Sequence, residues 1–337
     1  MQLALTYHVE APRETRSEEA YAEVIRQVEL ADRLGFEYAW FSEHHAHAHY
    51  GHLPAPLLLA LHLAGRTHRI RLGTAIICLN LHYPFAIAEQ VAVADVLTGG
   101  RMSVGFGSGS TPEEFALFGL PVTDPEQRHE RFEEALSIIL QTWSGRVDLP
   151  SAVHFPIPAH SPLPIPPSDL HARSWVAVNS TASARIAGKL QFNMMFSHLR
   201  TPEQYREYRQ VYAEAGGEGL VAANRPVYIG ENDAAACREA EPALRTLWRR
   251  FHSEGKIPAD TREPECVEQL CDHPINFLLG GPETVAAQIE ALHREVPFEI
   301  LNLEPQWAGL DSELVEGSLE RLTQEVRPLI RDLQSIK

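Results

Sequence analysis

The 337-residue sequence predicts an α/β protein that folds as a single (β/α)8 TIM barrel. Three observations support this prediction. Short apolar runs alternate with helix-like segments along the chain, most connections between them are short, and eight of the runs have strand character. Such alternation indicates parallel strands joined by right-handed crossovers. We therefore expect one domain that covers residues 1–337.

The predicted strands are runs of four to nine mostly apolar residues bounded by polar or turn-forming ones. In chain order they cover residues 3–7, 38–41, 70–78, 101–106, 175–178, 192–196, 225–229 and 298–303. In a barrel of this kind the side chains that carry chemistry lie at the carboxyl ends of the strands. The residues that follow each run are therefore the first candidates for a site.

The predicted helices are segments whose apolar residues recur on one face. The first of them shows the i, i+3, i+4, i+7 spacing at Tyr21, Val24, Ile25 and Val28. The others cover residues 56–65, 84–97, 132–143, 180–190, 202–215, 233–251, 282–292 and 315–333. Each predicted strand is thus followed by at least one helix.

Two segments, residues 144–173 and 252–276, interrupt the alternation and are predicted to be insertion loops. Seven prolines lie between Pro150 and Pro167, which argues against a helix or a central strand there. We expect the first insertion to cross the surface and to pack through His154, Phe155 and Ile157.

The composition excludes several classes of partner. A formal net charge of -16 argues against a nucleic-acid or anionic-membrane surface, because either would need a basic patch. No apolar stretch approaches the ~18 residues that a membrane span needs. The four cysteines form no C-x-x-C pair, and no leader-like segment follows Met1, so we expect a cytoplasmic, reduced protein.

A histidine-rich segment begins where the second predicted strand ends. It opens with Glu43-His44-His45 and continues with His47, His49 and His52. Glycine and proline make the segment a loop, so the helical H-x-x-x-H spacing of a metal site is not supported, and we predict no metal. The three later histidines fit a solvated loop. His44 is the candidate catalytic residue, and Glu43 is positioned to orient an imidazole or to end the strand.

Two further strand ends carry candidate binding residues. The turn after the fourth strand reads G-x-G-x-G through Gly107 and Ser108, which differs from the dinucleotide fingerprint G-x-G-x-x-G. It is either a tight turn or a set of backbone N–H groups that faces an anion or a ring. Asn179 and Ser180 open a predicted helix, where they form either an ordinary N-cap or a phosphate seat.

The sequence resembles the bacterial luciferase-like flavin monooxygenases over essentially its whole length, most densely in residues 1–143. The segments that carry the resemblance are Trp40-Phe41-Ser42-Glu43-His44-His45, Leu72-Gly73-Thr74-Ala75, Gly100-Arg101, the turn from Gly107 to Gly109, Val178-Asn179-Ser180 and Gly280-Gly281-Pro282-Glu283. Together these motifs are specific to the family but not to one substrate.

The resemblance implies a flavin monooxygenase that uses reduced FMN, supplied by a separate flavin reductase, and O2 to oxidise a small apolar organic substrate. It assigns catalysis to His44, with Glu43 beside it. It places Thr74, Ala75 and Ile76, with a non-proline cis peptide between the last two, along with Gly107, Ser108, Asn179 and Ser180, at the flavin. It also implies a homodimer.

The sequence departs from the family pattern at two of these positions. Ser108 stands where luciferase has an arginine that helps to bind phosphate, and Asn179 stands where a glutamate is usual. These departures leave the flavin open, so a deazaflavin-dependent oxidoreductase on the same barrel is the main alternative. A flavin-binding protein without turnover, and a metal-dependent hydrolase that uses His44, His45 and His47, are the others.

Overall fold

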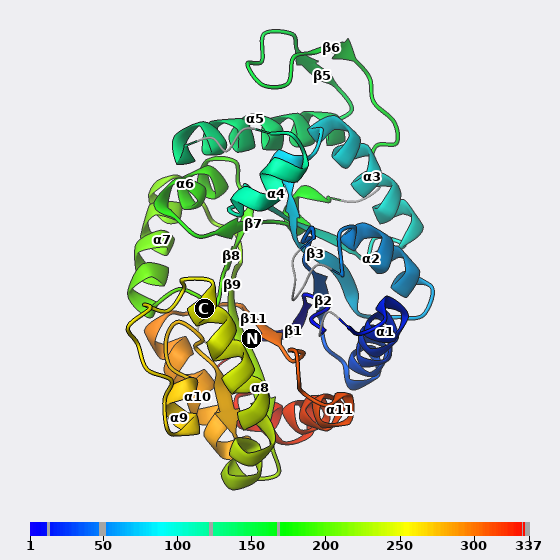
Figure 1. Cartoon of the computed structure of the whole chain (residues 1–337). Helices are drawn as coiled ribbons and strands as arrows, with labels where there is room; N and C mark the ends of the chain where they lie inside the picture. The colour runs from blue at the N-terminus through cyan, green and yellow to red at the C-terminus, as the bar shows by residue number, and fades with distance from the viewer. Residues whose placement is uncertain (12–13, 47–51, 121–123, 167–168, 332, 334–337) are drawn as a thin grey trace.

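The computed structural model describes residues 1–337 apart from 12–13, 47–51, 121–123, 167–168, 332 and 334–337. Eight parallel strands close into a barrel in the order β1-β2-β3-β4-β7-β8-β9-β11, and β11 pairs back onto β1. The strands are β1 (Gln2–Tyr7), β2 (Tyr38–Phe41), β3 (Arg71–Cys78), β4 (Met102–Gly107), β7 (Ser174–Val178), β8 (Asn193–Phe196), β9 (Val221–Ile229) and β11 (Ile300–Glu304). The predicted (β/α)8 barrel is confirmed (Figure 1).

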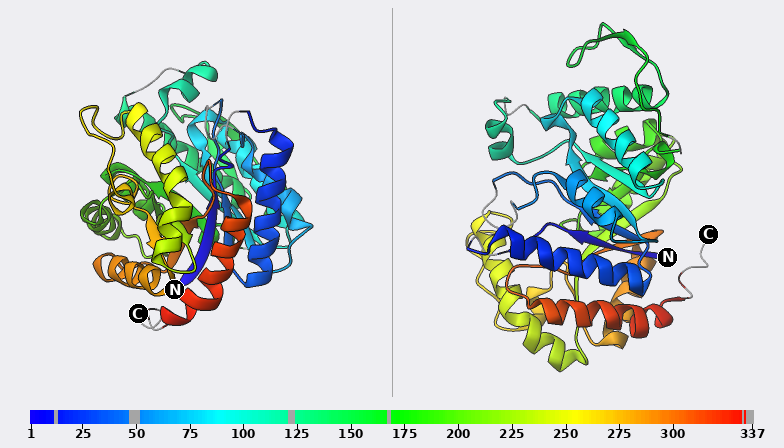
Figure 2. Two further views of the ribbon diagram at one scale, coloured as in Figure 1. Left: turned by 60° about the horizontal axis from the view of Figure 1, so that its bottom comes forward. Right: turned by 90° about the vertical axis from the view of Figure 1, so that its right-hand side faces the viewer.

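Helices surround the barrel, as Figure 2 shows from two further sides. The main ones are α1 (Ser17–Leu34), α2 (Pro56–Ala64), α3 (Pro84–Leu97), α5 (Pro125–Trp143), α6 (Thr181–Lys189), α7 (Pro202–Glu214), α8 (Asp233–Ser253), α10 (Pro282–Glu295) and α11 (Ser312–Arg321). The chain after α11 continues as a π-helical turn, Leu322–Val326, and α12 (Arg327–Leu329). None of the described helices combines the length and apolar character that crossing a bilayer requires.

The sequence prediction missed several short elements. Helix α4 (Pro112–Leu117) follows β4, short 3-10 turns cover Leu79–Leu81 and His171–Arg173, and α9 (Val267–Leu270) lies in the second insertion. A short strand, β10 (Leu278–Gly280), pairs with the far end of β9, beyond the part of β9 that pairs with β11. The helices among these elements are too short to show a periodicity, because fewer than two turns of helix repeat no pattern. Their polar and proline-rich surroundings hide them further.

The first insertion forms an antiparallel hairpin, β5 (Val147–Leu149) with β6 (Ile157–His160), which projects beyond α5 in Figure 1. Phe155 and Ile157 are buried, as predicted, while His154 is half-buried. The Glu134 carboxylate on α5 accepts backbone N–H bonds from the residues of this loop at 2.7 to 2.9 Å. The second insertion packs Ile257 and its neighbours against α8 in a core cluster of its own.

The barrel interior has an apolar floor. Its buried residues are Ala4, Tyr38, Trp40, Trp175, Met195, Ala222 and Ile300, which come from six different strands. The larger core fills the space between the strands and the helices, and contains the alternate residues of the same strands, such as Leu3, Leu5, Leu301 and Leu303. Because strand side chains alternate between two faces, this division fixes which residues point into the barrel.

Candidate active site at the barrel mouth

The predicted residues lie at the carboxyl ends of four neighbouring strands. The ends of β2 and β3 contact each other directly. The Ser42 hydroxyl donates to the Ala75 carbonyl at 2.7 Å, and the Glu43 N–H donates to the Ile76 carbonyl at 3.1 Å. The peptide bond between Ala75 and Ile76 is cis, as the resemblance implied. Both side chains, with Ala177, pack on the apolar floor and remain partly exposed at the mouth.

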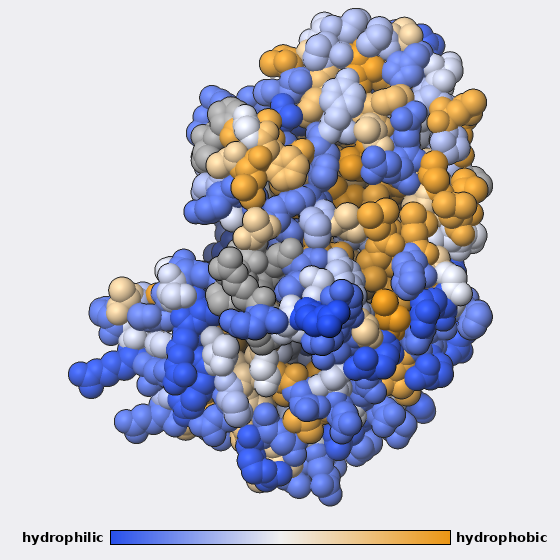
Figure 3. Space-filling view, turned by 45° about the vertical axis from the view of Figure 1, so that its right-hand side comes forward, coloured by the Kyte–Doolittle hydropathy of each residue, from blue (hydrophilic) through white to orange (hydrophobic). Residues whose placement is uncertain are grey.

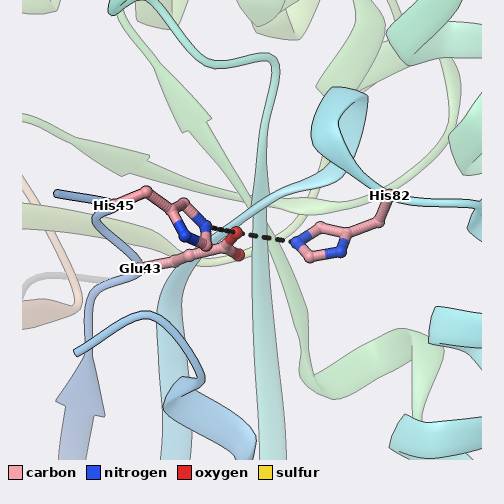
Figure 4. Close-up of side chains that lie close together, drawn as sticks. All are labelled: Glu43, His45 and His82. Atoms are coloured by element: carbon pink, nitrogen blue, oxygen red, sulfur yellow. Dashed lines mark hydrogen bonds and ion pairs between the residues drawn. The ribbon is translucent and has the colours of Figure 1, made fainter. Parts of the chain in front are cut away.

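The Glu43 carboxylate is buried and holds two imidazoles (Figure 4). Its Oε1 lies 2.7 Å from both His45 Nε2 and His82 Nε2, and its Oε2 accepts the Cys78 N–H at 3.0 Å. Glu43 therefore orients an imidazole, but the two that it contacts are His45 and His82 and not His44. His82, which lies in the connection between β3 and α3, was not predicted from the sequence.

Glu43, His45 and His82 form a group that could hold a metal ion, and His44 is not part of it. The two nitrogen–oxygen separations of 2.7 Å are hydrogen-bond distances. An ion bound between those atoms would push them apart, because each ligand atom would have to lie about 2 Å from the metal. His47 lies outside the described residues. The geometry of the group fits a hydrogen-bonded carboxylate.

His44 faces a carboxylate that the sequence analysis did not identify. Glu114 on α4 places its Oε1 3.3 Å from His44 Nδ1 and accepts the His45 N–H at 2.9 Å. Burial lowers the pKa of His44, and the nearby Glu114 opposes that shift without cancelling it. Burial acts to raise the pKa of Glu114, but its bonds to His44 and to the His45 amide hold it below the ordinary value. At neutral pH this gives a neutral imidazole beside a carboxylate.

Strands β3 and β4 approach closely beneath this pair. The Thr74 hydroxyl is fully buried and bonds to the Gly105 carbonyl and N–H, both at 3.1 Å. A Cβ at Gly105 would lie 2.5 Å from the Thr74 carbonyl oxygen, and one at Gly107 would lie 2.8 Å from Ile76 Cδ1. Glycine at these positions therefore lets the end of β3 lie against β4. The Thr74 side chain does not reach the mouth.

Asn179 and Ser180 lie where β7 leads into α6. Ser180 is the N-cap, and its hydroxyl forms a reciprocal capping box with Ser183. In the first turn of α6 the Ser183 amide donates to the Ser180 hydroxyl at 3.2 Å, while the amides of Thr181 and Ala182 have no partner within the helix and lie at the positive end of its dipole. Ser180 Oγ is 3.4 Å from His129 Nε2 on α5, and the Asn80 amide bonds the carbonyls of Ser108 and Arg128 at 2.9 and 3.0 Å.

Arg128 and His129 bring potential cations to this end of the mouth, and the sequence analysis identified neither. The Nε of Arg128 is buried without a hydrogen-bond partner among the described residues. The pKa of His129 lies below its ordinary value, mainly because of burial. The bond to the Pro125 carbonyl opposes this shift, and the charge of Arg128 adds to it. Both features suit an anion, which would pair with Arg128 and would favour the protonated form of His129.

A second polar cluster lies on the β1–β11 side of the mouth. Glu304 Oε1 lies 3.0 Å from His198 Nδ1 and 3.4 Å from His8 Nε2, and accepts the Asn224 amide at 2.7 Å. Burial acts to raise the pKa of Glu304, but His198 and His8 hold it well below its usual range. Burial acts to lower the pKa of His8, but Glu304 and Glu10 raise it overall. The rings of His8 and His44 are 5.7 Å apart, so this cluster adjoins the His44 site.

Comparison with known proteins identifies the family of the chain. Residues 1–297 match the family model described as luciferase-like monooxygenase. The chain belongs to this family. The oxygenase component of flavin-dependent trigonelline monooxygenase from Acinetobacter baylyi is 24% identical over 97% of the chain and 95% of its own length. Three other curated relatives, 35 to 39% identical, align with 32 to 48% of their own lengths, so this chain matches less than half of each.

Solved structures agree on the fold. Monooxygenase RslO1 from Streptomyces bottropensis superimposes with a TM-score of 0.81 at 22% identity, covering 97% of this chain and 99% of that one. The oxygenating constituent of 3,6-diketocamphane monooxygenase from Pseudomonas putida, solved with FMN, gives a TM-score of 0.76 at 21% identity, with coverages of 97% and 98%.

Another relative found by its sequence, an F420-dependent glucose-6-phosphate dehydrogenase from Beutenbergia cavernae, is 31% identical over 53% of each chain.

Proposed function

We propose that this protein is the oxygenase component of a two-component flavin monooxygenase. In this proposal it takes reduced FMN from a separate reductase and uses O2 to oxidise a small organic substrate. The observation that carries the proposal is the His44–Glu114 pair at the same barrel mouth as the partly exposed Ala75 and Ile76. Family membership and the FMN complex of the camphane relative support it.

The residues present fit a flavin mononucleotide. Ala75, Ile76 and Ala177 offer apolar surface to a flat ring system. The amides of the first turn of α6, with Ser180, Arg128 and His129, offer donors and positive charge to a phosphate. Arg128 would supply the positive charge that Ser108 lacks, and a bound phosphate would favour the protonated form of His129. The bound flavin would supply the electrons that activate oxygen.

His44 would move a proton at the flavin edge. Its Nδ1–H donates to Glu114, so the imidazole carries its lone pair on Nε2 and accepts a proton there. Glu114 stabilises the imidazolium that then forms and fixes the tautomer. Glu43 does not contact His44. It would act as a positioning residue, because it holds His45 and His82 and accepts the Cys78 N–H.

Oxygen uptake tests the proposal. Purified protein, an added flavin reductase, NADH and FMN are supplied with a panel of aldehydes, ketones, terpenes and aromatic compounds, and substrate-dependent product is measured. We expect a panel member to be oxygenated with FMN and His44→Ala to lower that rate about 10²- to 10⁴-fold, the usual contribution of a positioned acid–base group. His52→Ala, in the same loop, is the control. If His44→Ala leaves turnover unchanged, the assigned role is wrong.

The second candidate is a deazaflavin-dependent oxidoreductase, which the F420-dependent relative and the departures at Ser108 and Asn179 favour. Reconstitution with F420 in place of FMN separates the two candidates, because the deazaflavin reaction transfers a hydride and consumes no oxygen. Binding of either flavin without turnover on the panel would indicate a flavin-binding protein, and stoichiometric metal in the purified protein would favour the hydrolase.

We further propose that the protein is a homodimer through α2 and α3. Both helices expose large apolar side chains, namely Leu58, Val93, Val96 and Leu97, with Tyr83 beside them. Figure 3, in which this side of the molecule comes forward, shows apolar residues gathered on that face. Helix α3 carries apolar side chains on its exposed face as well as on its buried face, which is typical of a helix covered on both sides.

A further inference from the structure

Two imidazoles from neighbouring strands lie side by side at the barrel mouth. His8 follows β1 and His44 lies beyond the end of β2, and their ring centroids are 5.7 Å apart. The two side chains keep 22% and 25% of their surface exposed, so both can be reached from the mouth. The proposed function gives a role to His44 alone.

Each of these imidazoles has a carboxylate of its own. His44 Nδ1 lies 3.3 Å from Glu114 Oε1, and His8 Nε2 lies 3.4 Å from Glu304 Oε1. Burial acts to raise the pKa of both carboxyl groups, but the histidines beside them hold it below the ordinary value, so both are ionised at neutral pH. The other charged groups around each ring therefore decide which of the two carries a proton.

His8 has the more negative surroundings. Burial acts to lower its pKa, but Glu304 and Glu10 hold it above the ordinary value, and Arg250 on α8 offsets only part of their effect. Glu10 is itself paired with Arg250, whose Nη1 lies 3.0 Å from its Oε1. His8 therefore keeps its proton to a higher pH than an ordinary imidazole does.

His44 has the opposite balance. Burial lowers its pKa, Glu114 opposes that shift without cancelling it, and the charge of His8 lowers the pKa further. Like charges this close disfavour each other, so the two rings titrate as a coupled pair, and a single proton on the pair resides on His8. A proton donor and a proton acceptor thus lie next to each other at the mouth.

The backbone beside His8 is strained. Val9 has a φ of 52°, a left-handed conformation that β-branched residues rarely adopt, and its side chain is buried. Strained residues of this kind persist only where the surrounding structure imposes them, and they concentrate at functional sites. The turn at Val9 places Glu10 where its carboxylate acts on His8.

We propose that His8 is a second catalytic residue, the general acid that works beside His44 as the general base. The role rests on the proposed monooxygenase function. In that reaction one atom of O2 enters the substrate and the other leaves as water, while the reduced flavin supplies the two electrons and the two hydrogens. Glu304 is the positioning residue of the acid, as Glu114 is of the base.

The proposal accounts for one of the two protons that the leaving water takes up. His44 accepts a proton at Nε2, and His8 gives one from Nδ1 to the oxygen atom that leaves as water, while its Nε2–H stays on Glu304. The proton on His44 then passes to His8 through water. The pair therefore ends each turnover with the proton count with which it began.

The order of the two pKa values suits this division of roles. A base works when it is deprotonated, so activity falls as the pH drops through the pKa of His44. An acid works when it is protonated, so activity falls as the pH rises through the pKa of His8. Because the lower pKa belongs to the base and the higher one to the acid, both groups are in their working form between the two values.

Titration of the imidazole signals by NMR tests the protonation states in the full chain without flavin. His8→Gln and His44→Gln each remove one signal and so identify it. We expect His8 to titrate above and His44 below the ordinary ~6.5, at least about one pKa unit apart. Glu304→Gln should lower the pKa of His8, whereas Glu133→Gln, in an exposed ion pair on α5, should move neither signal. A wild-type His8 signal that titrates at or below that of His44 overturns the proposal.

The pH profile of kcat in the oxygen-uptake assay tests the catalytic role. We expect a bell-shaped profile for the wild type. His8→Gln should lower kcat about 10²- to 10⁴-fold and remove the alkaline limb while keeping the acid limb. Glu304→Gln should move the alkaline limb to lower pH, because Glu304 raises the pKa of His8.

His198→Gln is the matched control. His198 Nδ1 lies 3.0 Å from the same Glu304 oxygen, so this variant disturbs the cluster without removing the acid, and the alkaline limb should remain. An alkaline limb that survives in His8→Gln, or that is lost in His198→Gln, overturns the proposal. Should His8→Gln fail to fold, Glu304→Gln identifies the same signal and the same limb by their shift.

The two measurements separate this proposal from the monooxygenase function. Flavin-dependent oxygenation with a His8 signal that titrates no higher than that of His44 would keep the monooxygenase and reject the acid. Opposite protonation of the two rings in a protein without flavin-dependent turnover would keep the coupled pair and reject the monooxygenase, together with the role of His8 in it.

Discussion

Glu114 Oε1 lies 3.3 Å from His44 Nδ1, which joins the loop after β2 to the short helix α4. The same oxygen accepts the His45 amide, so one carboxylate fixes both the position and the tautomer of the proposed catalytic residue. Because α4 is separated from the loop by about 70 positions in the chain, only the barrel brings the two together.

Replacing Glu114 should change the pH dependence of catalysis. Glu114 raises the pKa of His44 against the lowering effect of burial, so Glu114→Gln should lower that pKa further. The limb of the pH–rate profile that reports His44 then moves to lower pH, and kcat falls about 10-fold or more as the imidazolium loses its counter-charge. Glu113→Gln, the exposed neighbour on the same helix, is the control. An unshifted profile would show that Glu114 only supports the loop.

Enlarging Gly105 should disturb the mouth from below. The added Cβ of Gly105→Ala would lie 2.5 Å from the Thr74 carbonyl oxygen, which is backbone and cannot swing away. We expect a loss of about 1–3 kcal/mol in the free energy of unfolding, as for other overpacked cores, together with weaker flavin binding. Gly65→Ala, whose Cβ has no atom nearer than 4.0 Å, should change neither. Denaturant unfolding and flavin titration measure the two effects, and an unaltered Gly105→Ala protein would refute the close approach.

The Glu304 cluster should make stability depend on pH in two directions. Folding lowers the pKa of Glu304. The ionised carboxylate therefore stabilises the fold fully above the unfolded pKa of ~4.3, and this stabilisation is lost as the pH falls through the folded pKa. Folding raises the pKa of His8. The protonated imidazole therefore stabilises the fold fully below the unfolded pKa of ~6.5, and this stabilisation is lost as the pH rises through the folded pKa. Glu304→Gln should therefore destabilise most between about pH 5 and 6.5, by about 1–3 kcal/mol.

Melting temperatures of wild type and Glu304→Gln across this pH range measure the effect. Glu133→Gln, which removes an exposed ion pair with Lys189, should shift the curve little at any pH. A difference in Tm between wild type and Glu304→Gln that is constant from about pH 4 to about pH 8 would contradict the ionic account.

The proposed dimer predicts a mass that falls on substitution. Leu97 is 67% exposed on α3, and Leu97→Glu should convert dimer to monomer in light scattering, because a charge would be buried unpaired at the interface. Leu220→Glu alters an exposed apolar residue that precedes β9, on the side of the barrel opposite β3, and should leave the mass unchanged. A monomeric wild-type protein would refute the dimer.

The sequence by itself determined the barrel, because eight apolar runs alternating with amphipathic segments can bury their faces in few other ways. His44 and Ser180 were singled out because each follows an apolar run, and Ala75 and Ile76 because of the resemblance to the family. The sequence could not locate Glu114 or His82, since nothing in a short polar segment shows which strand end it will face. Glu304 was also not predicted, because the last predicted strand ended one residue early, at Leu303.

Only the tertiary structure decided which groups meet. Glu43 was expected to orient an imidazole, and the fold gives it His45 and His82 while Glu114 takes His44. Asn224 looks like an ordinary strand residue in the sequence, and its amide meets Glu304 only because β9 and β11 become neighbours. The physical reason is that periodicity records which face a residue occupies, whereas closure of the barrel sets its partners from distant parts of the chain.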